Sequence, residues 1–127
     1  MYLKQKTRLF ILLLVLFSFT SHLHASAIAD SIRMTMKHLT GQELLQSHSN
    51  LCRIAAAQDD FDNEISSIRE YINEAHRQGD TEAEGQARTM QMMCYYNYYL
   101  PDSLKSALPK NLEFMGKHEQ WDHYYSS

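Results

Sequence analysis

The fold of this chain is decided by residues 40–79, TGQELLQSHSNLCRIAAAQDDFDNEISSIREYINEAHRQG. Two apolar stripes with the three-to-four-residue spacing of an amphipathic helix lie on either side of Asp59-Asp60. The first stripe consists of Leu44, Leu45, His48, Leu51, Cys52, Ala55 and Ala56, and the second of Phe61, Ile65, Ile68, Ile72 and Ala75. Because β-branched runs with period-two alternation are absent, the segment predicts two antiparallel helices joined by a short turn.

The ends of these predicted helices carry capping signals. Thr40 and Glu43 have the capping-box spacing, in which each side chain accepts from a backbone amide of the other residue. Acidic residues fill the first turn of the second helix, where negative charge complements the helix dipole. Gly79 is a predicted C-cap, and Asp80 with residues 81–84 is predicted to begin a third helix with another capping box.

Further helices are predicted before and after this pair. A short helix over residues 30–39 presents Ile32, Met36 and Leu39 on one face. The third helix has a stripe that consists of Ala83, Ala87, Met90, Cys94, Asn97 and Tyr98, and Leu100-Pro101-Asp102 ends it. A last element carries Leu104, Leu108, Leu112 and Met115. Pro109 lies inside it, and because proline lacks a backbone donor and clashes with the preceding turn, we expect a kink or a restart there.

An internal repeat is visible when the sequence is aligned with itself at a shift of 42 residues. At this shift Leu51-Cys52 falls on Met93-Cys94, and His76, Gln78 and Asp80 fall on His118, Gln120 and Asp122. A shift of 43 is needed to place Phe61 and Ile65 on Leu104 and Leu108. Such a repeat predicts stacked helix pairs, with Trp121, Tyr124 and Tyr125 at the start of a third unit.

The helix pair resembles a tetratricopeptide-type repeat. A tyrosine or phenylalanine opens the second helix in that family, and Gln58-Asp59-Asp60-Phe61-Asp62 resembles the turn before it. The unit is longer than the usual length of about 34 residues, and Glu64 and Tyr71 stand where the family places small alanines. The resemblance covers about residues 40–127. It implies an all-α fold of antiparallel helix pairs, stacked as a short, truncated solenoid that binds a protein or peptide and needs no cofactor.

A second resemblance concerns residues 92–104, MMCYYNYYLPDSL, with Trp121-Asp122 downstream. This stretch is similar to the exported N-terminal sensor regions of some bacterial two-component histidine kinases, which carry such repeats before a membrane span and a kinase core. No kinase motif occurs in the 127 residues.

The N-terminus has the three parts of a secretory signal peptide. Lys4, Lys6 and Arg8 precede an uncharged, leucine-rich run over residues 9–19, and Ala25-Ser26-Ala27 offers small residues to a signal peptidase. A retained membrane anchor is the alternative, but the run is shorter than the roughly 20 apolar residues of a span. We therefore predict a signal peptide over residues 1–27, with cleavage after Ala25 as a variant, and a helical-repeat domain over residues 28–127 that is incomplete at its C-terminus.

Charge and cysteine content limit the partners and the redox chemistry. Residues 1–27 contain three of the 12 basic and none of the 15 acidic residues, so cleavage changes the net charge from −3 to −6. A chain of this sign without a basic patch is a poor candidate for binding nucleic acid or anionic lipid. Cys52 and Cys94 fall on apolar stripes of different helices, which favours two buried thiols over a disulfide.

The candidate binding residues are aromatic: Tyr95, Tyr96, Tyr98, Tyr99 and Trp121. Aromatic side chains on the open face of stacked helix pairs are good anchors for a protein ligand, and packing against neighbouring helices is the alternative. His118 and Asp122 are four residues apart, but His123 is rotated off that face, so Glu119 and these residues predict a solvated turn and no metal site. His48, on an apolar stripe, is interpreted as a core histidine.

Two hypotheses of function follow, neither of them enzymatic because no nucleophile, phosphate-loop or hydrolase motif is present. The first is a protein-interaction module, exported through the Sec route to the periplasm. The second is the sensor part of a larger two-component protein, on the extracytoplasmic face of the inner membrane. A small exported enzyme that uses His118 or His123 is a third and weaker reading. We also expect low stability in isolation, because two repeat units are fewer than the roughly three such proteins need.

Overall fold

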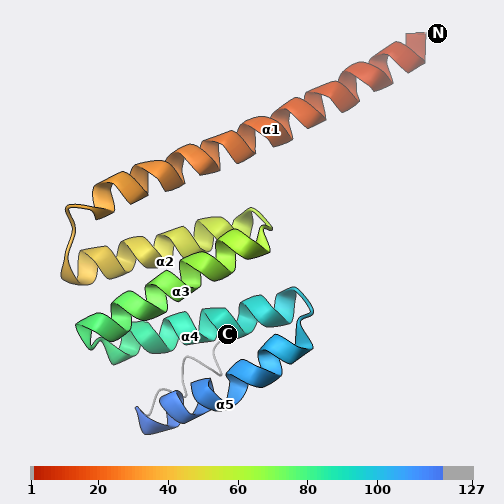
Figure 1. Cartoon of the computed structure of the whole chain (residues 1–127). Helices are drawn as coiled ribbons and strands as arrows, with labels where there is room; N and C mark the ends of the chain where they lie inside the picture. The colour runs from red at the N-terminus through yellow and green to blue at the C-terminus, as the bar shows by residue number, and fades with distance from the viewer. Residues whose placement is uncertain (1, 119–127) are drawn as a thin grey trace.

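The structure is a computed structural model that describes the backbone of residues 2–118 and the side chains of residues 4–17 and 24–118. Within this part of the chain all regular elements are helical, and successive helices run antiparallel and stack in a row (Figure 1). The helices are α1 (Tyr2–Met36), α2 (Gly41–Ala57), α3 (Phe61–Gln78), α4 (Thr81–Asn97) and α5 (Pro101–Lys117). The predicted all-α arrangement of stacked helices is thereby confirmed.

The core lies between α2, α3 and α4, where each helix packs mainly on its neighbours in sequence and α2 also contacts α4. The predicted stripes form it, since Leu45, Cys52, Ile65, Ile68, Ala75, Ala87 and Cys94 are all buried. Ile68 is among the largest fully buried side chains, so its truncation to alanine costs about 2–5 kcal/mol. Two stripe members differ from expectation, because Ala56 and Asn97 are exposed.

Helix α1 is much longer than the helix predicted over residues 30–39, because it begins at Tyr2 and passes without a break through the predicted cleavage site. Ala29 is buried and Ile32 and Met36 are half-buried, which shows that the last two turns of α1 pack on α2. The large apolar side chains over residues 9–17 are exposed on the half of α1 that extends past the other helices (Figure 1). None of the helices in the described part of the chain combines the length and apolarity that a membrane span requires.

The helices begin and end close to the predicted capping residues, but not all of the predicted capping hydrogen bonds form. Thr40 is the N-cap of α2, but its side chain makes no capping hydrogen bond, so the capping box predicted there is wrong. Gly41, the first helical residue, has φ +59°, a conformation that favours glycine. Asp80, not Thr81, caps α4 by accepting from the amide of Ala83 at 2.9 Å. Gly79 caps α3 as predicted, in the left-handed conformation at φ +70°.

Helix α5 contradicts the predicted restart at Pro109, because it is continuous from Pro101 to Lys117. Pro101 occupies the first turn, where its missing amide costs nothing. Pro109 leaves the carbonyl of Lys105 without its helical donor, but both residues are exposed, so water can satisfy that carbonyl.

The helix pairs repeat every 40 residues, not every 42 as the sequence alignment predicted. α2 begins at Gly41 and α4 at Thr81, and α3 begins at Phe61 and α5 at Pro101. The same shift relates the two turns, in which Asp59 and Tyr99 both have φ 54°. Equivalent buried pairs at this shift include Leu45 and Gly85, Ser49 and Thr89, Cys52 and Met92, Tyr71 and Asn111, and Ala75 and Met115. The repeat is thus one of geometry and burial, with different residues in these buried pairs.

Candidate functional site

The four tyrosines near the end of α4 do not share one surface. Tyr95 is buried, and Tyr98 packs edge-on against the ring of Phe61 with 5.1 Å between ring centroids. Tyr96 and Tyr99 are 66% and 90% exposed. The fifth candidate, Trp121, lies outside the described residues, as do Glu119, Asp122 and His123.

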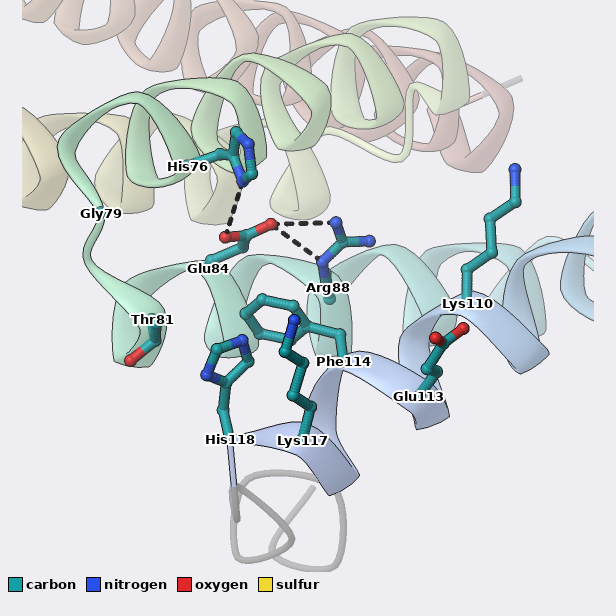
Figure 2. A pocket seen from close by; sticks show the side chains of 10 residues that line it. All are labelled: His76, Gly79, Thr81, Glu84, Arg88, Lys110, Glu113, Phe114, Lys117 and His118. Atoms are coloured by element: carbon teal, nitrogen blue, oxygen red, sulfur yellow. Dashed lines mark hydrogen bonds and ion pairs between the residues drawn. The ribbon is translucent and has the colours of Figure 1, made fainter.

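The best-connected polar cluster joins α3, α4 and α5 (Figure 2). The Glu84 side chain is only 4% exposed, and its Oε1 accepts from Nε and Nη2 of Arg88 at 3.2 and 2.9 Å. Its other oxygen, Oε2, lies 3.2 Å from Nδ1 of His76. Arg88 also donates from Nη1 to Oδ1 of Asn111 at 2.9 Å, and its guanidinium lies 4.8 Å from the centre of the Phe114 ring. The buried charge of Glu84 is therefore paired within α4, and Arg88 connects this pair to α5 through Asn111 and Phe114.

Two hollows flank this cluster between α4 and α5. One, of about 430 Å³, lies beside the α3–α4 turn and is lined by His76, Glu84, Arg88, Lys117 and His118, among others (Figure 2). The other, of about 480 Å³, lies towards the start of α5 and is lined mainly by polar side chains. Arg88 and Lys110 line both hollows, so a ligand in either would compete with the internal bonds of Arg88.

A third hollow, which we name the α2–α4 groove, differs from these in its chemistry. Its volume is about 240 Å³, and most of its walls are apolar. It is lined by Cys52, Arg53 and Ala56 of α2, Glu64 and Ile68 of α3, and Thr89, Met90, Met93 and Asn97 of α4. Met93 is one of the few exposed large apolar side chains outside α1, with 37% of its surface accessible.

Glu64 is the acidic group of the α2–α4 groove, and it is only 7% exposed. No ion pair joins it to a basic side chain of the described residues. Burial raises the pKa of its carboxyl, and the neighbouring Tyr98 and Cys94 partly oppose that rise. The Tyr98 hydroxyl is buried, and desolvation and then the carboxylates of Glu64 and Asp59 raise its pKa to about 12.

Sequence reasoning noticed Glu64 only as a departure from the tetratricopeptide pattern. The signal that marks it is its position, since Glu64 lies between Phe61 and Ile68 on the buried stripe of α3. Tyr71, the other departure, is buried as well and donates from its hydroxyl to Oε1 of Gln86 at 3.3 Å.

The remaining chemistry-bearing groups belong to the core. His48 is half-buried and stacks on Tyr71 at a centroid distance of 6.4 Å, and burial lowers its pKa. Cys52 and Cys94 are free and buried, and desolvation raises the pKa of each thiol to about 12, so they are weak nucleophiles. His118 packs on Phe114, and the described residues contain no group of three or more His, Cys, Asp or Glu side chains suited to a metal ion.

Comparisons with protein-family models, with curated protein sequences and with solved structures found no significant match to this chain.

Proposed function

We propose that this chain is a non-enzymatic protein-interaction module, built from helical repeats of tetratricopeptide type, that holds a peptide segment of its partner in the α2–α4 groove. The observation that carries the proposal is the groove itself. It is a mostly apolar hollow between two helices that occupy equivalent places in successive repeat units. Exposed apolar surface beside a concave site is typical of protein-binding surfaces.

The residues at the groove suit a peptide ligand. Met90 and Met93 have unbranched side chains that adapt to irregular apolar surfaces, a property common at sites that bind several sequences. Tyr96, one of the predicted aromatic anchors, lies three residues beyond Met93 and hence on the neighbouring surface of α4. Tyr96 therefore keeps its proposed role as an anchor, and Tyr99 can extend the contact at the α4–α5 turn.

The α2–α4 groove is a better candidate binding site than the two α4–α5 hollows, because Arg88, which lines both hollows, is already paired with Glu84. Glu84 and Arg88 already satisfy each other, and a ligand would have to break those hydrogen bonds. A buried, hydrogen-bonded pair of this kind contributes to the specificity of helix packing. We therefore assign the α4–α5 cluster to the assembly of the repeat.

We further propose that the module acts outside the cytoplasm after export by the Sec route. The support is the basic residues that precede the exposed apolar side chains over residues 9–17 of α1. The alternative is the sensor part of a larger two-component protein, for which the support is the resemblance of residues 92–104. These residues form the end of α4, the following turn and the first turn of α5.

The binding proposal is tested by selecting peptides from a phage-displayed random library on the full chain. We expect enriched peptides whose binding is weakened in Met93→Gln, because a neutral amide of similar length replaces an apolar wall of the groove without adding charge beside Glu64. Met34→Gln is the matched control, since Met34 is an exposed methionine of α1. A library without enrichment, or peptides that bind equally to both variants, would exclude the α2–α4 groove.

The two settings are separated by cell fractionation. An antibody against residues 42–120 is expected to detect a small periplasmic protein if the module acts alone. A large membrane-bound band would instead support the sensor alternative.

A further inference from the structure

The burial of Glu64 lowers the stability of the fold when its carboxyl group is ionised. An ionised carboxylate that is buried without a basic partner is strongly destabilising, and proteins normally pair such groups or replace them by neutral ones. Tyr98, Cys94 and Asp59 are the side chains that shift its pKa, and none of them carries a positive charge. Arg53 lines the same groove but forms no ion pair with Glu64. No packing requirement explains the charge, because glutamine has nearly the same shape. A buried charge without an ion-pair partner calls for an explanation, and the α2–α4 groove beside Glu64 gives room for a basic group from outside the chain.

We propose that the α2–α4 groove is a subsite for a lysine side chain of the bound peptide, with Glu64 as the carboxylate that meets the ammonium group. This inference rests on the proposed function, and it names the chemistry of the partner. The geometry that points to it is an apolar hollow with one buried, unpaired acid in its lining.

The dimensions and the walls of the groove suit this side chain. Its volume of about 240 Å³ is below the roughly 300–1,000 Å³ of a pocket for a whole small ligand, but it can hold one long side chain. Met90, Met93 and Ile68 offer apolar contacts to the four methylene groups of lysine. Glu64 is the acidic side chain in the lining, and the Thr89 hydroxyl, which donates to the carbonyl oxygen of Gly85 at 3.0 Å, keeps lone pairs that can also accept from the ammonium.

The charge of the whole chain favours a basic partner. The net charge is −3, and it becomes −6 if residues 1–27 are removed. Such a field increases the rate at which a basic peptide associates, and the ion pair with Glu64 gives specificity once the ammonium is desolvated. We propose lysine in place of arginine because a hollow of about 240 Å³ with mostly apolar walls matches a compact ammonium on a flexible apolar stem better than a planar guanidinium.

Arg53 is the competing occupant within the chain. It lines the same groove and is exposed, and no ion pair joins it to Glu64. The experiment therefore has to separate three cases: a lysine of a partner, the chain's own arginine, and a groove that binds apolar side chains without regard to charge.

The test uses the full chain, amide NMR and two blocked peptides, acetyl-Gly-Ala-Met-Lys-Met-Ala-Gly-amide and its norleucine counterpart. We expect the lysine peptide to shift the amides of Arg53, Ala56, Met93 and Asn97 and to bind about tenfold more tightly than the norleucine peptide. Glu64→Gln should remove this preference for lysine. Glu70→Gln, which neutralises an exposed glutamate of the same helix, should leave it unchanged.

Each contrary result has a distinct meaning. Equal binding of the two peptides to the wild-type chain overturns the lysine subsite but leaves the peptide-binding function standing, and this comparison needs no variant to fold. Failure of both peptides overturns the subsite, while the library selection decides the function separately. If lysine-dependent binding appears only in Arg53→Ala, Arg53 is the partner of Glu64 in the wild-type chain, and the proposal is overturned.

Discussion

Replacement of Arg88 by methionine measures how strongly the polar cluster holds α5 against α4. In the structure the guanidinium donates two hydrogen bonds to Oε1 of Glu84 and one to Oδ1 of Asn111. Methionine keeps most of the apolar stem but has no donor. Glu84 is then left with His76, a side chain that is itself largely exposed.

The size of the effect follows from the burial of Glu84. Because this side chain is 4% exposed, water cannot replace the lost donors without local opening of the α4–α5 interface. Removal of one partner of a buried ion pair costs about 3–5 kcal/mol. Arg88 is 23% exposed and His76 remains, so we expect the lower end, about 3 kcal/mol. That is a large fraction of the roughly 5–15 kcal/mol that stabilises a typical domain.

The assay is urea unfolding followed by far-ultraviolet circular dichroism. Arg69→Met, at an exposed position of α3, is the control and should change the free energy of unfolding by less than about 0.5 kcal/mol. Adding Glu84→Gln to Arg88→Met should recover at least about 1 kcal/mol, because no unpaired charge is then buried. A loss below about 1 kcal/mol for Arg88→Met would refute the reasoning, as would a double variant that costs the sum of the single ones.

Three further predictions concern other buried or paired groups. The thiols of Cys52 and Cys94, with pKa values of about 12, should react with a disulfide reagent near pH 8 about a thousandfold more slowly than in urea, whereas equal rates would contradict their burial. The hydrogen bond from Arg77 lowers the pKa of Glu74 to about 2, so the stability that this pair adds above about pH 4.5 should be lost as the pH falls towards 2. In a circular-dichroism titration, Arg77→Ala should move this acid transition to higher pH. Burial raises the pKa of Glu64 above its unfolded value of about 4.5, so its ionisation lowers the stability of the fold as the pH rises. Glu64→Gln should therefore have a higher melting temperature than the wild type near neutral pH, and this difference should disappear below about pH 4. A lower melting temperature of the variant at neutral pH would show that the carboxylate is structurally paired.

The helices of the repeat could be predicted from sequence because their stripes are local patterns. Residues such as Ile65, Ile68 and Ala75 fall on one face whatever the tertiary structure, and burying that face against another helix is the main source of helix stability in proteins. The register of the repeat could not be predicted in the same way. The alignment at a shift of 42 matched residue identities, whereas the turns at Asp59 and Tyr99 repeat after 40 residues with no identity in common.

The tyrosine cluster shows how the end of a helix changes a surface. In an uninterrupted helix Tyr99 would lie four residues beyond Tyr95 and hence on the same face. α4 ends at Asn97, however, and the positive φ of Tyr99 directs its side chain into solvent while Tyr95 stays buried. The sequence therefore predicted one aromatic binding face, whereas in the structure Tyr95 is buried and Tyr96 and Tyr99 are exposed.

The two buried glutamates differ in whether a basic side chain of the chain pairs with them. Both lie among buried residues of a helix, Glu64 on α3 and Glu84 on α4. The partner of Glu84 can be read from the sequence, because Arg88 is four residues later on the same helix face. The positions three and four residues from Glu64 hold Asp60, Phe61, Ser67 and Ile68, so its own helix offers no base, and Arg53 of α2 lines the same groove without an ion pair to it. The fold therefore supplies a base for Glu84, whereas the base proposed for Glu64 is a lysine that enters the α2–α4 groove from outside.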